Sequence, residues 1–157
     1  MQKDFNFYKK LLEDNRPPVI FKEEEHEYWL GDKQLSGITG RINEVLYGGN
    51  KYAGVPEYTM ERARMRGSLI HKEIEEYYVS GILGFTDELQ KFIELQEEHG
   101  FKVLANEYTV TDFETYATNI DLILFRDNEL ELQDIKSTAQ LDKEYLSWQL
   151  SINAFML

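Results

Sequence analysis

The chain contains no cysteine among its 157 residues. This absence excludes disulfide bonds, thiolate zinc sites, cysteine nucleophiles and iron–sulfur clusters held by cysteine. No apolar run approaches the roughly 18–20 residues that span a bilayer. The N-terminal segment MQKDFNFYKK has charges on both sides of a short aromatic stretch, which is unlike a signal peptide. We therefore expect a cytoplasmic protein with no membrane partner.

Basic residues are scarce relative to acidic ones. Seventeen lysines and arginines stand against 29 aspartates and glutamates, which gives a formal net charge of −12. A field of this sign disfavours a protein that coats nucleic acid with its whole surface. It still permits a local basic path, and the segment RARMRGSLIHK (residues 62–72) carries three arginines and a lysine without any acid.

The remaining composition is that of a globular domain, with 42% hydrophobic and 13% aromatic residues. A chain of this length can bury a core within one domain. Hydrophobic periodicity, caps and breakers predict helices at 4–14, from Thr39 as the cap to 46, at 59–79, at 87–98, and from Asp142 onward. Strands are predicted within 19–35 around an acidic turn, and at about 101–110, 116–126 and 129–136. The order of two helices, a three-strand meander and a helix predicts an α/β fold.

The segment IDLILFRDNELELQDIKS (residues 120–137) predicts a hairpin with charged residues at its open end. A two-residue primed turn at Asp127-Asn128 would place Asp121 opposite Asp134, with Cβ atoms ~4.5–5.5 Å apart. Strict alternation would then put both carboxylates and Lys136 on one face of the hairpin. Opposed like charges destabilise a sheet, but a divalent cation between the carboxylates would remove this cost. Oxygen ligands of this kind suit Mg²⁺, Mn²⁺ or Ca²⁺.

A plainer interpretation is a solvated sheet end with an ordinary Asp134–Lys136 ion pair. Two further residues bear on the choice. Glu107 would fall opposite Asp121 if its strand turns through residues 113–115, and His71 borders the apolar stripe of the long helix, next to Ile70. Taken alone, Glu107 is more typical of an exposed strand position, and His71 of a core or surface residue.

The ordered set of these residues resembles the PD-(D/E)XK nuclease superfamily, specifically its RecB-type and phage exonuclease-like branch. The resemblance covers residues 19–157 and includes the lead-in EHEYWLGDKQLSGIT (residues 25–39). The matching positions are Arg66-Gly67, His71, Glu107, Asp121, Asp134-Ile135-Lys136 and Gln149. The resemblance implies one domain over residues 1–157 with a restriction-endonuclease-like αβββαβ core at 58–157, preceded by an extension of strands and helices at 1–57. The final strand of that core is not visible in the sequence, so we expect a chain truncated at its C-terminus.

The resemblance also implies roles for these residues. Asp121 and Asp134 would bind a catalytic Mg²⁺ or Mn²⁺, with His71, Glu107 and the Ile135 carbonyl completing or supporting the site. Lys136 would position and activate the attacking water, and Gln149 would orient the site. Arg64 and Arg66 would contact phosphates of DNA. Two positions depart from the family, since Asn119 stands where relatives often have glycine, and Asn153 where they often have tyrosine.

The expected function is a metal-dependent DNA nuclease, exonuclease-like, in phage or bacterial recombination and repair, with DNA and further protein subunits as partners. A first alternative is a non-catalytic nuclease-fold module within a recombination or repair assembly. A second is an unrelated acidic α/β domain that binds proteins. A catalytic nuclease binds metal and cleaves, whereas the module does not cleave. In the acidic domain the carboxylates serve solubility alone.

Overall fold

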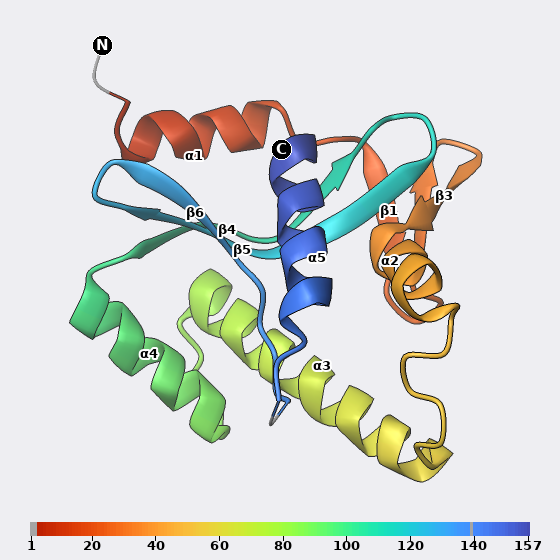
Figure 1. Ribbon diagram of the computed structural model, residues 1–157. Coiled ribbons are helices and arrows are strands. Elements are labelled where there is room, and N and C mark those ends of the chain that lie inside the picture. Colours follow the sequence, from red (N-terminus) through yellow and green to blue (C-terminus); the bar gives the residue numbers. More distant parts are fainter. Residues whose placement is uncertain (1–2, 139) are drawn as a thin grey trace.

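Residues 3–138 and 140–157 are described here from a computed structural model (Figure 1). The described residues form five helices and six strands. The helices are α1 (Phe5–Asp14), α2 (Ile38–Tyr47), α3 (Glu57–Ser80), α4 (Asp87–His99) and α5 (Lys143–Met156). The strands are β1 (Val19–Lys22), β2 (Glu27–Leu30), β3 (Lys33–Gly37), β4 (Lys102–Thr111), β5 (Tyr116–Arg126) and β6 (Glu129–Gln133). The predicted α/β class is confirmed.

All six strands belong to one mixed sheet, with the order β1-β2-β3-β5-β4 and with β6 also paired to β5. The strands β3 and β5 are parallel at Ser36–Tyr116 and Gly37–Ala117, and all other pairs are antiparallel. Because β4 pairs along one edge of β5, the other edge is shared by β3 near its start and β6 near its end. Residues 118–121 lie between these two partners. The sheet edge is therefore open in the middle of β5.

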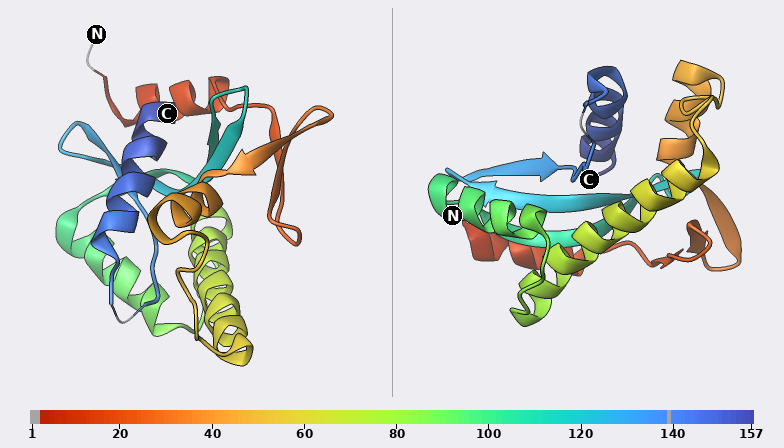
Figure 2. Two further views of the ribbon diagram at one scale, coloured as in Figure 1. Left: turned by 45° about the vertical axis from the view of Figure 1, so that its right-hand side comes forward. Right: turned by 90° about the horizontal axis from the view of Figure 1, so that it is seen from below.

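Helices cover both faces of the sheet. The helices α3 and α4 pack against Leu122 and Leu124 on one face, and α1 packs with Ile120 and Ile123 on the other. Figure 1 shows α1 above the sheet and α3 and α4 below it, and the right-hand view of Figure 2 shows α5 on the side of the sheet opposite α4. The helix α5 contacts α2, β4, β5 and β6, and its Met156 packs with Ile120 and Ile123.

Local signals explain most of the helix ends. The Asp4, Thr86 and Asp142 side chains cap α1, α4 and α5 by accepting backbone N–H bonds. The helices α3 and α4 end at Gly81 and Gly100, whose positive φ values of 68° and 66° suit glycine. The predicted helices at 4–14, 59–79, 87–98 and from Asp142 onward are thus present, with ends that differ by at most two residues.

The prediction that Thr39 caps a helix is wrong. The helix α2 begins at Ile38 after Gly37, which makes no side-chain cap, so Thr39 lies inside the first turn. The Thr39 carbonyl instead accepts a hydrogen bond from the Tyr145 hydroxyl at 2.9 Å. The backbone at Thr39 is therefore bonded to α5, about a hundred residues further along the chain.

The predicted register of the hairpin is confirmed, but the predicted end of its second strand is wrong. Asp127 and Asn128 have φ values of 52° and 66°, as a primed turn requires. The ladder runs from Arg126–Glu129 to Leu122–Gln133 and stops there. Beyond the ladder, the backbone N–H of Ile135 donates to the Asp121 carboxylate at 2.6 Å. A hydrogen bond to a side chain thus takes the place of a backbone pair, and residues 134–136 leave the sheet.

The N-terminal segment of residues 1–57 contributes strands to the same sheet as the rest of the chain. The hairpin of β1 and β2 continues into β3, which pairs with β5. In the part of the chain that is described, no helix combines the length and apolarity needed to cross a membrane.

Candidate metal centre

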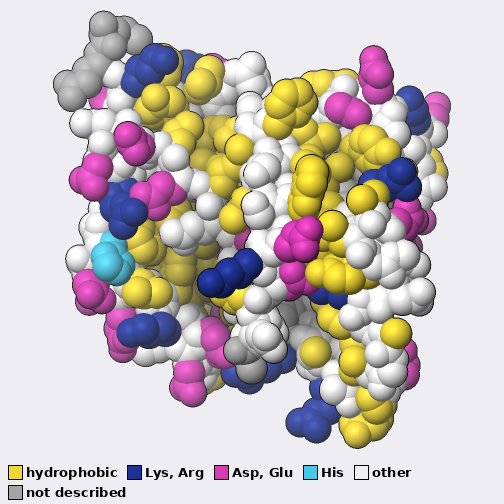
Figure 3. Space-filling model, viewed as in Figure 1, with side chains coloured by type: hydrophobic (Ala, Val, Ile, Leu, Met, Phe, Trp, Pro, Cys, Tyr) yellow, Lys and Arg dark blue, Asp and Glu magenta, His cyan; other side chains and the backbone are white. Residues whose placement is uncertain are grey.

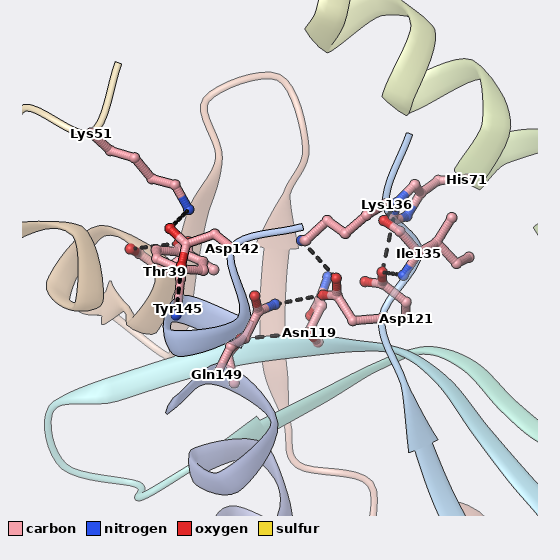
Figure 4. Close-up of polar contacts among 12 residues, drawn as sticks. Thr39, Lys51, His71, Asn119, Asp121, Ile135, Lys136, Asp142, Tyr145 and Gln149 are labelled. Atoms are coloured by element: carbon pink, nitrogen blue, oxygen red, sulfur yellow. Dashed lines mark hydrogen bonds and ion pairs between the residues drawn. The ribbon is translucent and has the colours of Figure 1, made fainter. Parts of the chain in front are cut away.

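Three side chains from three separate elements converge beside the open edge of β5. His71 lies on α3, Glu107 on β4 and Asp121 on β5, and one ligand atom of each lies within 4.8 Å of the others. The Nδ1 atom of His71 lies 3.0 Å from Glu107 Oε1, and its Nε2 atom lies 3.6 Å from Asp121 Oδ2. Figure 4 shows His71 reaching from the helix toward Asp121 and the backbone of Ile135.

An irregularity of the sheet turns both carboxylates toward α3. Glu107 has φ = 47°, an unusual conformation for a residue other than glycine. It lies opposite Asp121, because the flanking residues pair as Asn106–Leu122 and Tyr108–Ile120. Alternation fails here, since Ile120 packs with α1 while Leu122 packs with α3 and α4.

This irregularity corrects one expectation about the hairpin. Strict alternation predicted that Asp121 shares a face with Ile123, but Ile123 packs with α1 whereas Asp121 contacts His71 on α3. A backbone held in a sparsely populated region costs of order 1–3 kcal/mol and is typical of sites where geometry matters for function.

The electrostatics of the centre couple a buried acid to a protonated base. Burial alone would lower the pKa of His71, but the hydrogen bond to Glu107 and the charges of Asp121 and Glu107 outweigh it and raise that pKa to about 9. Burial raises the pKa of Asp121, and the charge of Asp134 adds to this, against the opposing effect of His71. The positive charge of the imidazolium therefore holds the two carboxylates together, as a metal cation would.

Ile135 contributes both of its backbone groups to this centre. Its N–H donates to Asp121, and its carbonyl oxygen lies 3.2 Å from His71 Nε2. The carbonyl thus lies beside His71, one of the ligands that the resemblance implied. With His71 protonated on both nitrogens, Nδ1–H donates to Glu107 and Nε2–H to Ile135.

Asp134 forms a neighbouring group with Lys136 and Gln149. Its Oδ1 atom accepts a hydrogen bond from Gln149 Nε2 at 2.7 Å, and its Oδ2 atom lies 2.7 Å from Lys136 Nζ. The Asp134 side chain is only 5% exposed. Asp134 therefore points to α5 and to its own loop, and not to Asp121 across a ladder pair.

The two arginines predicted to contact phosphates are exposed and already paired with acids. Arg64 lies 3.4 Å from Glu57 and 3.3 Å from Glu61, and Arg66 pairs with Glu88 on α4. Exposed pairs of this kind are weak, so a nucleic-acid phosphate can compete for either arginine.

Two residues near the centre had no predicted role. Tyr28 is buried, and burial, with the charges of Glu107 and Asp121 adding to it, raises the pKa of Tyr28 to about 12. The Asn106 side chain donates to the Asp121 carbonyl at 3.1 Å. Tyr28 lies in the EYWL segment, where a buried tyrosine is an ordinary core residue, so the only signal was its place in the lead-in of the resemblance.

The two positions that depart from the resemblance both carry buried or bonded amides. Asn119 accepts a hydrogen bond from the Thr109 hydroxyl at 2.7 Å, so its larger side chain is accommodated across the β4–β5 pair. Asn153 lies on α5 one turn after Gln149 and is 1% exposed. Both residues are accommodated within the fold.

The donor set fits a divalent cation that prefers oxygen ligands. Two carboxylates, one imidazole and a backbone carbonyl lie close together, and carboxylate and carbonyl oxygens suit Mg²⁺ and Mn²⁺. The carboxylates of the buried Asp121 and the half-buried Glu107 repel each other and would be stabilised by such an ion. The proton on His71 would have to leave before its nitrogen could act as a ligand.

No protein-family model matches the chain, and neither the curated proteins nor the solved structures give a match.

Proposed function

We propose that this protein is a metal-dependent nuclease that hydrolyses phosphodiester bonds of DNA, with an exonuclease-like action. The observation that carries the proposal is the convergence of His71, Glu107 and Asp121 from three elements, next to the Asp134–Lys136–Gln149 group. These side chains are separated by up to 78 residues of sequence, yet they occupy one end of the hairpin. A set of ligands beside a lysine is what metal-assisted phosphate hydrolysis requires.

The order of elements supports the same proposal. The helix α3 carries His71, the meander β4-β5-β6 carries the acids, and α5 carries Gln149. We interpret this as the αβββα part of a restriction-endonuclease-like core. Under this interpretation, β1 to β3 and α2 are additions that extend the sheet past the open edge of β5.

The residues of the chain divide the work in this proposal. Mg²⁺ or Mn²⁺ would be held by His71, Glu107, Asp121 and the Ile135 carbonyl. The ion would offset the negative charge of the scissile phosphate and lower the pKa of a bound water. Asp134, held by Gln149, fixes Lys136 beside the centre. The Lys136 ammonium orients the attacking water and stabilises charge that develops on the phosphate.

A second candidate function is a nuclease-fold module that binds nucleic acid without cleaving it. Two observations favour it. The Lys136 ammonium is neutralised by Asp134, and the net charge of −12 opposes DNA binding by the surface as a whole. In this case the centre would be a structural metal site.

The nuclease proposal is tested by incubating linear DNA with the protein and Mg²⁺ or Mn²⁺. We expect cleavage by the wild type, and a loss of about 100-fold or more in both variants, because Asp134→Ala releases the Lys136 ammonium from its partner and Lys136→Ala removes it. Glu129→Ala and Lys143→Ala are matched controls, since both residues are exposed and lie outside the site. Equal cleavage by the wild type and the two site variants would refute the proposal.

Calorimetric titration with Mn²⁺ separates the two candidates. Both predict binding that is lost in Asp121→Asn, because this change removes a charged oxygen ligand. Only the nuclease also cleaves DNA under the same conditions. Unchanged Mn²⁺ affinity in Asp121→Asn would reject both and favour an acidic protein-binding domain.

A further inference from the structure

Three tyrosine rings and one carboxylate surround the ammonium group of Lys51. The Nζ atom lies 3.5 Å from the ring centroid of Tyr145, 5.6 Å from that of Tyr47 and 5.8 Å from that of Tyr52. It also lies 3.1 Å from Asp142 Oδ2, and the Lys51 side chain is only 15% exposed. An ammonium over aromatic faces is stabilised more strongly when it is desolvated. This is a specific site for one cation, filled by a residue of the chain itself.

The contacts of Lys51 join the end of α2 and the segment that follows it to the distant helix α5. Lys51 lies in the segment of residues 48–56 between α2 and α3, and its backbone N–H donates to the Asn43 side chain on α2 at 3.2 Å. Tyr47, at the end of α2, bonds to Asp142, the N-cap of α5. The Lys51 site therefore fastens the segment 48–56 and α2 to the start of α5.

The same end of α5 leads directly to the candidate centre. Tyr145, which lies under the Lys51 ammonium, precedes Gln149 by one helical turn, so the two side chains share a face of α5. Both are buried, and Gln149 donates to Asp134 at 2.7 Å. In Figure 4, Lys51 contacts Asp142, which contacts Tyr145 at the start of α5. Gln149 lies further along the same helix, and its side chain points toward the side of the site where Lys136 lies.

We propose that Lys51 is a positioning residue, which fixes the start of α5 and thereby holds Gln149 against Asp134. Its effect on catalysis rests on the proposed nuclease function, whereas its effect on the position of Gln149 does not. Arginine can replace lysine here, because a guanidinium also binds aromatic faces and carboxylates. Methionine has a similar length and no charge, so it removes the interaction while filling the space.

The position of Gln149 can be measured without any activity, from its side-chain amide signal in a ¹⁵N–¹H NMR spectrum. The signal is assigned by its loss in Gln149→Leu. In Lys51→Met we expect this signal to shift and broaden, and amide hydrogen exchange at residues 145–149 to rise about tenfold, as local opening becomes easier. Lys51→Arg should resemble the wild type. Lys143→Met is the matched control, since Lys143 is an exposed lysine on the same first turn of α5.

An unchanged Gln149 signal in Lys51→Met would overturn the inference. The kinetic arm uses linear DNA with Mn²⁺, where we expect kcat to fall about tenfold with KM changed less than twofold, because positioning acts on the chemical step. A rise in KM with kcat unchanged would make Lys51 a substrate contact and would also overturn the inference. If the wild type does not cleave DNA, the nuclease proposal fails, and the NMR result still decides whether Lys51 positions Gln149.

Discussion

His71 is the residue whose ionisation most directly reports the candidate centre. Its pKa in the folded protein is about 9, against an ordinary value of 6.5. Below pH 6.5 the imidazolium is present in both states, and its hydrogen bond to Glu107 stabilises the fold fully. Between pH 6.5 and 9 the unfolded chain loses this proton first, so the stabilisation declines, and it is lost above about pH 9.

This linkage predicts how stability changes with pH in the metal-free protein. With EDTA present, the free energy of unfolding of the wild type relative to His71→Gln should fall by about 3 kcal/mol from pH 6 to pH 9.5. Urea denaturation at both pH values measures the difference. His99→Gln, at the exposed end of α4, should follow the wild type. A difference that grows with pH would contradict the proposed partners of His71.

At the scale of elements, the junction of α3 and α4 depends on one buried carboxylate. Glu73 on α3 accepts hydrogen bonds from the backbone N–H groups of Phe85 and Thr86, at 2.9 and 3.0 Å, and from the Thr86 hydroxyl. The Thr86 oxygen in turn accepts the Leu89 N–H and caps α4. A Cβ at Gly84 would lie 2.2 Å from Glu73 Cδ, so a side chain at this position would displace the carboxylate from its hydrogen bonds.

Glu73→Gln should therefore destabilise the fold although it changes few atoms. An amide offers one acceptor oxygen where the carboxylate offers two, so one N–H at the junction loses its partner. We expect a loss of about 1–3 kcal/mol in the free energy of unfolding, measured with urea at pH 7. Glu75→Gln, an exposed neighbour on α3, is the control and should change it by less than about 0.5 kcal/mol. Equal effects of the two changes would show that the junction does not depend on Glu73.

At the scale of the whole molecule, the excess of acid shapes both stability and partner choice. The net charge is −12, and most ion pairs join exposed side chains, such as Lys10 and Asp14. Figure 3 shows acidic and basic side chains scattered over one face, its centre included, with hydrophobic side chains exposed between them. On α5, Trp148 and Phe155 are 52% and 92% exposed. Weak exposed pairs cannot balance the general repulsion.

Salt should therefore stabilise the protein. Raising NaCl from 10 to 300 mM shortens the Debye length from roughly 30 Å to below 10 Å and screens the repulsion among acids. We expect the free energy of unfolding, from urea titrations with EDTA, to rise by about 1 kcal/mol. A fall would show that the ion pairs outweigh the net repulsion.

Several features were predictable from the sequence because their causes are local. The primed turn at Asp127-Asn128 fixed the hairpin register, and Thr86, Gly81 and Gly100 set the ends of helices. Such signals act through the backbone of a few adjacent residues. The order of His71, Glu107 and Asp121 along the chain indicated a shared centre only through its resemblance to a nuclease family, since no local signal connects the three residues.

Tertiary structure decided what depends on residues far apart in the chain. The strand β6 stops at Gln133 because Asp121 takes the Ile135 N–H, and Asp121 faces α3 because the sheet is irregular at Glu107. Tyr47 and Tyr52 are neighbours of Lys51 in sequence, but its contacts with Tyr145 and Asp142 at the start of α5 have no local signature. The sequence by itself determined the elements and the candidate ligands. Their directions were set by packing and hydrogen bonds between distant segments, which no local pattern records.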